Sequence, residues 1–220
     1  MPVKIVVVTA SKGTLLGHCL NTKVFRRNVH SVVTDRACGA EGVAVEHGVE
    51  VVRIEESDNA NFSLQLLRYL KANDIDYVVS IFPRLFVDDL VREYAERIFN
   101  IHPALLPAFP GLGSFDTAIE YGVRFVGETI HVVDEGTDTG QIVMQCVYPV
   151  NAHDVLSTRH SLFVAECKML IQLAAWLEET RISVCGRNVE IRGGTFDDPH
   201  FSPSLDNDEA LDLDIMMPNK

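Results

Sequence analysis

Short, nearly continuous apolar runs recur through the first half of the chain. They are rich in Val and Ile and lie at residues 3–9, 29–35, 50–54, 77–82 and 97–102. Such runs are typical of strands that are buried on both faces, as in a parallel sheet. The stretches between them have helical patterns, at residues 14–27, 39–47, 62–73 and 88–96. This alternation predicts right-handed βαβ units and a doubly wound, mostly parallel α/β sheet.

The pattern changes after residue 114. Residues 114–122 predict a short helix, and residues 124–150 predict two long strands joined by a polar, glycine-bearing loop at 135–140. A hairpin of this kind usually adds antiparallel strands to the edge of a sheet. The longest helix is expected from Asp154, a plausible N-cap, to about residue 180. A short strand pair is expected at about 181–192.

The domain organisation is expected to be simple, because we find no internal repeat and no linker. Residues 1–200 are expected to form one catalytic domain, and residues 201–220 a loosely held acidic tail. At 220 residues and 24.5 kDa, a chain can bury a sizeable core without staples.

Composition narrows the classes of partner and compartment. A net charge of −12 argues against nucleic acid or an anionic membrane as the main partner. The five cysteines are scattered, with no C-x-x-C pair, which favours buried thiols in a reducing compartment over disulfides or a zinc site. The opening apolar run is too short for a membrane span and lacks a cleavage site, so a cytoplasmic location is expected.

The stretch FNIHPALLPAFPG at residues 99–111 carries the first candidate chemistry. Alternation along a strand places Asn100 and His102 on one face, and Pro103 ends the strand after them. Both side chains then lie at the carboxyl end of a parallel strand, where open α/β sheets bind ligands. An amide can donate to a developing oxyanion, and an imidazole can do so or move a proton. Taken alone, the tripeptide favours a structural role over a catalytic one.

The second candidate is HVVDEGTDTGQI at residues 131–142. Asp138 lies in a turn that needs Asp and Gly for backbone reasons, but beside a histidine it could favour the charged imidazole and receive a proton. His131 with Asp134 matches no common metal spacing, so no metal is expected.

The third candidate is the turn TASKGTLL at residues 9–16. Its backbone amides and Lys12 could hold an anion at the start of the first helix, although an ordinary βα turn explains it equally well. A dinucleotide fingerprint needs three glycines and this turn has one, which argues against a nicotinamide cofactor.

The first and second stretches, read together, change the interpretation. NIHPALLPAFPG at 100–111 and GETIHVVDEGTDTGQI at 127–142 resemble the folate-dependent formyltransferase family, and the likeness extends from the first strand to about residue 176. Within it, the chain is most similar to the branch that formylates glycinamide ribonucleotide in purine synthesis. The resemblance implies a Rossmann-like domain that moves a formyl group from 10-formyltetrahydrofolate to an amine.

The resemblance also implies roles for individual residues. Asn100, His102 and Asp138 fall on the family's catalytic trio: the first two stabilise the developing oxyanion, and Asp138 sustains the charge on His102 and relays the proton of the amine. The folate co-substrate is implied to bind Phe82, Pro83, Arg84, Leu85 and Phe86, together with Asp134, Glu135, Gly136 and Thr137. The acceptor is implied to bind Lys12, Gly13, Thr14, Leu15, Pro103 and Glu166.

The departures from the family pattern concern the acceptor. Gly13-Thr14-Leu15 replaces a Gly-Ser-Asn, Phe163 stands where a Lys or Gln is usual, and an expected arginine is missing near residues 59–61. The chemistry is therefore expected to be kept, whereas the acceptor is less securely indicated.

Several alternatives follow. The acceptor could be another amine, such as an amino sugar or a hydroxylamine, or water, which would make the protein a 10-formyltetrahydrofolate hydrolase. Hydrolases of this type usually carry an extra N-terminal domain, whereas this chain starts at the first strand. Formylation of methionyl-tRNA is disfavoured by the acidic charge and the lack of a C-terminal domain, and a non-catalytic binding protein by the intact trio. A homo-oligomer is compatible with the sequence.

Overall fold

The computed structural model describes residues 2–87 and 89–217. The chain divides into two compact units, which we describe separately. Unit 1 comprises Met1–Asn100 and Val132–Gly140, and unit 2 comprises Ile101–His131 and Gln141–Lys220. The first residue of the predicted helix 88–96 and the last three of the predicted tail lie outside the described residues.

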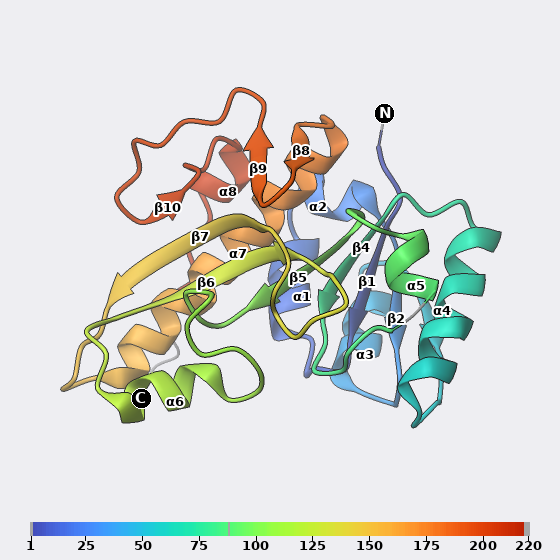
Figure 1. Ribbon diagram of the computed structural model, residues 1–220, viewed down its shortest axis with the longest axis horizontal. Helices are drawn as coiled ribbons and strands as arrows, with labels where there is room; N and C mark the ends of the chain where they lie inside the picture. Colours follow the sequence, from blue (N-terminus) through green and yellow to red (C-terminus); the bar gives the residue numbers. More distant parts are fainter. Residues whose placement is uncertain (1, 88, 218–220) are drawn as a thin grey trace. The chain divides into compact units, whose positions relative to one another are not determined.

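Unit 1 is built on parallel strands, as the apolar runs predict. In sequence they are β1 (Ile5–Thr9), β2 (Val29–Thr34), β3 (Glu50–Arg53), β4 (Tyr77–Ile81) and β5 (Ile98–His102). The residues of β5 up to Asn100 belong to unit 1. Strand β1 lies between β2 and β4, β3 pairs with β2, and β5 pairs with β4 (Figure 1). Every residue of β1 is buried, because both of its faces are covered.

Helices cover both faces of these strands (Figure 1). One face packs on α4 (Asn59–Ala72) and α5 (Asp89–Glu93), which contribute Phe62, Leu66 and Leu90 to the core around Val6 and Val8. The other face is covered by α1 (Thr14–Leu20), α2 (Lys23–Asn28) and α3 (Gly39–Glu46).

Several helices of unit 1 differ from their predicted bounds, and α5, predicted to reach residue 96, ends at Glu93. The stretch 14–27 forms two helices, because the chain turns at Asn21 and Thr22; the Thr22 hydroxyl donates to the Cys19 carbonyl at 2.7 Å. Helix α4 begins at Asn59 instead of residue 62, because the Asp58 side chain accepts a hydrogen bond from the Asn61 N–H and caps its first turn.

Unit 2 contains the predicted hairpin. Strands β6 (Phe125–Val132) and β7 (Ile142–Pro149) are antiparallel, and the short β10 (Phe201–Ser202) pairs with β7. The residues of β6 up to His131 belong to unit 2. The predicted strand pair is also confirmed, as β8 (Ile182–Cys185) and β9 (Asn188–Ile191). With the parallel strands of unit 1, this confirms the predicted fold class.

The helices of unit 2 are α6 (Ser114–Tyr121), α7 (Val155–Glu178) and α8 (Asp208–Leu211). The predicted cap of α7 is confirmed: the Asp154 carboxylate accepts from the Ser157 N–H at 3.1 Å. Helix α7 runs behind β6 and β7 (Figure 1) and supplies much of the core of this unit, including the fully buried Trp176.

The segment from residue 201 differs from the loosely held tail that the sequence predicts. Phe201, Leu205 and Ala210 are buried, and Asp206 accepts hydrogen bonds from Gln172 and Trp176 of α7 at 2.7 and 3.1 Å. Residues 201–211 therefore belong to the folded part of unit 2. The sequence did not indicate this packing, because polar and acidic residues separate the few apolar residues of the segment.

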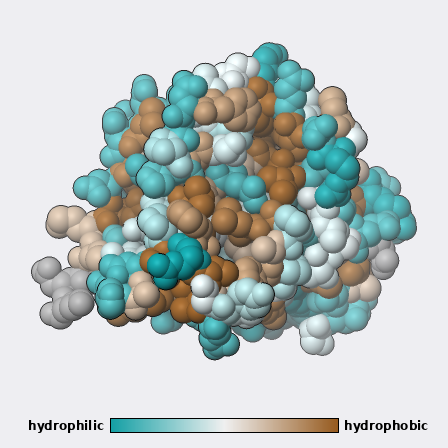
Figure 2. Space-filling view, turned by 60° about the vertical axis from the view of Figure 1, so that its left-hand side comes forward, coloured by the Kyte–Doolittle hydropathy of each residue, from teal (hydrophilic) through white to brown (hydrophobic). Residues whose placement is uncertain are grey.

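The surface of unit 2 is mixed in polarity. Figure 2 shows apolar residues between polar ones, and the exposed large apolar side chains of this unit include Tyr121, Phe125 and Leu156. Within the described part of the chain, no helix is both long and apolar enough to cross a membrane.

Candidate active site

Strand β5 carries the polar pair predicted from its sequence. It extends over Ile98–His102 as one strand, so its alternation places Asn100 and His102 on the same side of the strand. Asn100 ends the first segment of unit 1, where it pairs with Ser80 of β4, and is partly exposed.

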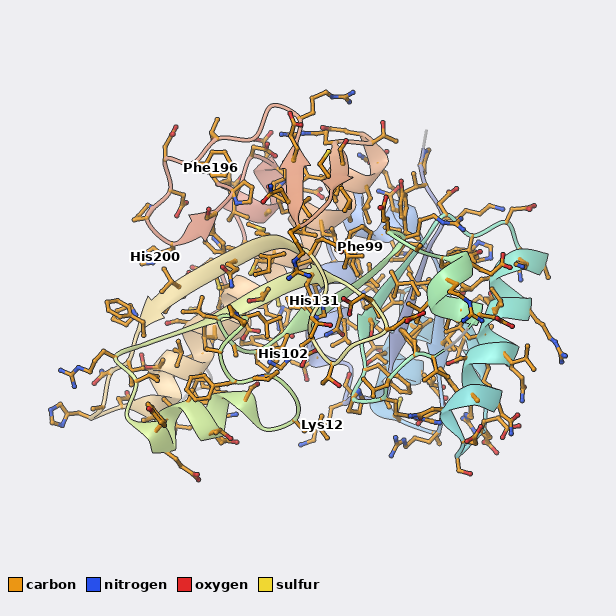
Figure 3. All side chains as sticks on the ribbon, in the orientation of Figure 1. Lys12, Phe99, His102, His131, Phe196 and His200 are labelled. Atoms are coloured by element: carbon orange, nitrogen blue, oxygen red, sulfur yellow. The ribbon has the colours of Figure 1, made fainter. Side chains whose placement is uncertain are left out.

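His102 lies in unit 2, where its ring is held in place. The side chain is 5% exposed, and Nε2 lies 2.9 Å from the Phe109 carbonyl oxygen. A carbonyl can only accept, so Nε2 carries a proton, which it donates to Phe109. Figure 3 shows His102 and the likewise buried His131 among the packed side chains of this unit.

The loop that follows His102 is fastened to the hairpin of unit 2. The Thr129 hydroxyl donates to the Ala104 carbonyl at 2.6 Å and accepts from the Leu106 N–H at 3.1 Å. Gln145 donates to the Leu106 carbonyl at 3.0 Å. Gly127 lets the loop come close, since a Cβ there would lie 2.6 Å from a methyl group of Leu105. The rigid loop predicted from its prolines is thus also held by side chains of β6 and β7.

Pro103 opens this loop and is exposed, and its carbonyl accepts a hydrogen bond from the Ser114 hydroxyl at 3.2 Å. The contact joins the loop to the first residue of α6. Pro103 is therefore on the surface of unit 2, as binding of an acceptor molecule would need.

The loop 132–140 belongs to unit 1. The Val133 N–H donates to the Ile98 carbonyl at 2.9 Å, which attaches the loop to β5 two residues before Asn100. The Asp134 carboxylate accepts from the Gly136 N–H at 3.1 Å and from the Thr139 hydroxyl at 2.7 Å. Asp134 therefore shapes the loop, while Glu135, Gly136 and Thr137 are exposed at its tip.

Asp138 lies in the same loop and is partly buried. Its φ of 54° is left-handed, a conformation that Asp tolerates better than most residues. Unit 1 thus carries Asn100 and Asp138, and unit 2 carries His102; whether the three side chains act together remains a prediction. Among the described residues, no cluster of three or more His, Cys, Asp or Glu side chains could hold a metal ion.

The predicted folate segment 82–86 is divided between buried and exposed residues. Phe82 and Phe86 are buried and stack with Phe62 of α4 at centroid distances of 5.3 and 6.4 Å. Pro83 and Leu85 are exposed, Leu85 by 51%. The aromatic residues therefore anchor the segment in the core of unit 1, and the residues between them face outward.

Arg84 of this segment is engaged within unit 1. Its guanidinium lies 5.0 Å from the centroid of the Phe62 ring, and it donates to Asn59 at 2.9 Å and to Asp35 at 3.1 Å. Arg36 and Arg84 hold the pKa of Asp35 below its usual range, against the opposing effect of burial. The side chain of Arg84 therefore fixes the loop, and a folate would meet the backbone of this segment more readily than this guanidinium.

A groove of about 530 Å³ opens beside Arg84 in unit 1. It is lined by residues 35–37, 55–57 and Arg84, which follow the carboxyl ends of β2 and β3. Its charged side chains are already engaged: Arg36 and Arg84 both bind Asp35, and Glu55 binds Arg53.

The β1–α1 turn brings together the predicted anion-binding residues Lys12, Gly13, Thr14 and Leu15. Gly13 has a φ of 88°, and a Cβ there would lie 2.9 Å from the Ala40 backbone, so only glycine fits. Lys12 and Thr14 are exposed, and Lys12 lies at the edge of unit 1 (Figure 3), whereas Leu15 is buried in the core. Leu15 can therefore contribute its backbone N–H but not its side chain.

Glu166, the remaining predicted acceptor residue, lies on α7 beside a second acid. Glu128 of β6 is 4% exposed, and the charge of Glu166 acts on its carboxyl group. Burial raises the pKa of Glu166 to about 7. Burial, and then the charge of Glu166, raise the pKa of Glu128 well above its ordinary value. Cys146 of β7 pairs with Glu128 across the strands, and burial raises the pKa of its thiol as well.

Glu128 is a residue that sequence reasoning misses, as are Thr129 and Gln145. A signal for Glu128 was present: in VGETIHV it stands on the same strand face as Val126 and Ile130, where an acid is unexpected. Thr129 and Gln145 look ordinary in a half-polar strand, and only the folded loop 103–111 shows what they bind.

Comparison with known proteins identifies relatives of this chain. Residues 3–172 match the formyl transferase family. The chain is 35% identical over 193 residues to a phosphoribosylglycinamide formyltransferase of Mycobacterium tuberculosis, an alignment that covers 84% of this chain and 90% of that protein.

Solved structures agree. Glycinamide ribonucleotide transformylase 1 of Symbiobacterium toebii superposes with a TM-score of 0.80 at 31% identity and covers 86% of this chain and 94% of that one. A formyltetrahydrofolate deformylase of Pseudomonas syringae superposes with a TM-score of 0.76 at 22% identity, over 87% of this chain and 66% of that one. The latter likeness is one of fold alone.

Proposed function

Since the chain belongs to the formyl transferase family, we propose that it transfers the formyl group of 10-formyltetrahydrofolate to a small-molecule amine, and that this amine is glycinamide ribonucleotide. The observation that carries the proposal is the position of both motifs, 100–111 and 127–142, inside the matched residues 3–172. A relative that is 35% identical over 84% of this chain and a solved structure that covers 86% of it are named for this acceptor.

Asn100 is the proposed hydrogen-bond donor to the carbonyl oxygen of the formyl group. Its amide does not titrate, so it can donate equally well before and after the oxygen gains negative charge. A donor aimed at the position where charge develops stabilises the transition state more than the ground state. Its place at the end of a parallel strand suits this role, because the strand fixes its backbone.

His102 is proposed to act through Nδ1. The Phe109 carbonyl binds the proton on Nε2, so the neutral ring is held in the tautomer whose Nδ1 accepts a proton, and the charged ring donates from Nδ1. The attacking amine must be neutral to form the new bond to carbon, and it must then lose a proton. We propose that Asp138 favours the charged ring and receives that proton through water.

The folate is proposed to bind the exposed residues of segment 82–86 and the tip of loop 134–137. The residues fit a flat, partly polar ring system: Leu85 offers apolar surface, and Gly136, Glu135 and Thr137 expose backbone groups. A Cβ on residue 136 would lie 2.0 Å from the Thr139 hydroxyl oxygen, so this position requires glycine. The acceptor is proposed to bind Lys12, Gly13, Thr14, Pro103 and Glu166, and the backbone of Leu15.

The test supplies 10-formyltetrahydrofolate with glycinamide ribonucleotide, with a panel of other amines, and with no amine. Formation of tetrahydrofolate and the mass of the formylated product are measured. We expect turnover to depend on glycinamide ribonucleotide and the product to gain one formyl group. Formate released at the same rate without amine would instead identify a hydrolase, and turnover with only another amine would overturn the acceptor.

Asn100→Ala tests the oxyanion role in the same assay. We expect kcat/KM to fall about 100-fold, because one donor to an oxyanion contributes about 3 kcal/mol. Asn188→Ala, an exposed asparagine of β9 in unit 2, is the matched control and should be as active as the unaltered protein. Equal activity of the two variants would remove Asn100 from the catalytic group.

A further inference from the structure

Two acids interact inside unit 2, one on β6 and the other on α7. Glu128 is 4% exposed in the middle of β6, and its carboxyl group interacts electrostatically with that of Glu166 on α7. Two ionised carboxylates at close range and out of water repel each other strongly. An arrangement of this kind persists only if at least one of the two groups keeps a proton.

An atom of Glu128 points to where that proton lies. Its Oε2 is fully buried and has no hydrogen-bond partner among the described residues. Buried polar atoms are nearly always paired, and each exception requires an explanation. If Oε2 carries the proton, it becomes a donor, and the neighbouring carboxylate of Glu166 is a suitable acceptor. A single proton on Oε2 then removes the repulsion and gives this oxygen a hydrogen-bond partner.

We propose that Glu128 keeps its proton at neutral pH, donates it in a hydrogen bond from Oε2 to the Glu166 carboxylate, and so positions Glu166 to accept a hydrogen bond from a hydroxyl group of the acceptor molecule. Glu128 is thus a positioning residue, and this role rests on the proposed function. Glu166 is the more exposed of the two, which suits it for contact with a ligand.

The surroundings of the pair support this assignment of the proton. In the described part of unit 2, the titratable group that acts on Glu128 is Glu166 from α7, and Glu128 in turn acts on the Cys146 thiol of β7. Burial raises the pKa of the thiol, so Cys146 adds no charge. Burial raises the pKa of Glu166 to about 7. Glu128 is the more deeply buried of the two, and burial and then the charge of Glu166 raise its pKa well above the ordinary value. The charge therefore resides on Glu166, and Glu128 keeps the proton.

The first experiment tests the pairing without any substrate. NMR titration of the glutamate side-chain carboxyl carbons is performed on the unaltered protein and on Glu166→Gln. We expect one carboxyl to titrate near pH 7 and another to remain protonated above it, and the latter to titrate at lower pH in Glu166→Gln. Titration of both carboxyls in the ordinary range of glutamate, or no change in Glu166→Gln, would overturn the proposal.

The second experiment tests the positioning role with glycinamide ribonucleotide. Glu128→Gln can still donate to Glu166, whereas Glu128→Leu cannot. We therefore expect Glu128→Gln to keep the KM for the acceptor, and Glu128→Leu to raise it about tenfold, on the scale of one hydrogen bond to a charged group. The KM for 10-formyltetrahydrofolate should not change in either variant. In the unaltered protein the acceptor KM should fall as pH rises through about 7, and this step should vanish in Glu166→Gln.

The outcomes separate the pairing from the proposed function. Glu120→Leu, at an exposed acid of α6, is the control and should keep both KM values. Equal acceptor KM in Glu128→Gln and Glu128→Leu would overturn the positioning role. If glycinamide ribonucleotide is not a substrate at all, the carboxyl titration still decides whether the pair shares its proton, as it also does if Glu128→Leu fails to fold.

Discussion

Two of the acidic side chains around helix α7 have opposite surroundings. Near its C-terminal end, Asp206 accepts from Gln172 at 2.7 Å, from Trp176 at 3.1 Å and from Arg181 at 2.6 Å. Nearer its middle, Glu166 meets another acid, Glu128, one of whose oxygens has no partner in the described structure.

The difference shows which acid serves the fold. A carboxylate with neutral and cationic donors around it stabilises the folded state, and here it fastens the segment 201–211 to α7. Two acids that raise each other's energy destabilise the folded state and are retained only where a protein uses them, which is common at functional sites. Substitutions at the two places should therefore change stability in opposite directions.

The largest effect is expected for Asp206→Ala. It removes the carboxylate that binds Gln172 and Trp176 and leaves Arg181, whose side chain is 14% exposed, without that counter-charge. We expect the free energy of unfolding to fall by about 4 kcal/mol, because three hydrogen bonds to a charged group are lost, each on the scale of about 1.5 kcal/mol. Urea denaturation measures it. A loss as small as that of a surface substitution would show that the segment 201–211 is not fastened by this residue.

The next effect is a dependence of stability on pH. The pKa of Glu166 is raised from the ordinary 4.5 to about 7, so between these values the folded state binds more protons than the unfolded state. Its free energy of unfolding must therefore fall as pH rises from about 4.5 to about 7 and then level off. Glu166→Gln removes this contribution, which amounts to about 3 kcal/mol. Denaturation of both proteins at pH 4.5 and pH 8 should show their stability difference changing by that amount, and a constant difference would contradict it.

A smaller, opposite effect is expected for Glu128→Leu. The substitution replaces a buried acid by an apolar side chain of similar size, which removes the cost of keeping a carboxyl group out of water. We expect the free energy of unfolding at pH 8 to rise by about 2 kcal/mol, together with the weaker acceptor binding described above. Thermal and urea unfolding measure the gain. A loss of stability would mean that the pair contributes to the fold in the same way as Asp206.

The smallest effect is expected for an ion pair on the surface of unit 2. Arg159 of α7 forms an ion pair with Asp116 of α6, and both side chains are more than half exposed, at 53% and 68%. Exposed pairs contribute little, so Asp116→Asn should lower the free energy of unfolding by about 0.5 kcal/mol or less. The pair should also weaken further in high salt. A loss comparable to that of Asp206→Ala would indicate that exposure does not explain the difference between the sites.

The sequence by itself determined the elements and the chemistry they carry. Continuous Val-rich runs, of the length typical of buried strands, predicted β1 to β5, and Asp154 predicted the start of α7. Both signals are local in the sequence. The motif around Asn100 and His102 was readable for the same reason: strand alternation and a following proline act within a few residues.

Only the tertiary structure decided what each polar side chain touches. Asp206 meets a residue 34 positions away in Gln172, Thr129 meets Ala104, and Arg84 is drawn to Asp35 instead of facing solvent. No pattern within a short window records such contacts, since they depend on how elements distant in sequence pack. Glu128 is the clearest instance: its place in a strand could be predicted, but its acidic partner comes from a helix that begins 27 residues later, at Val155.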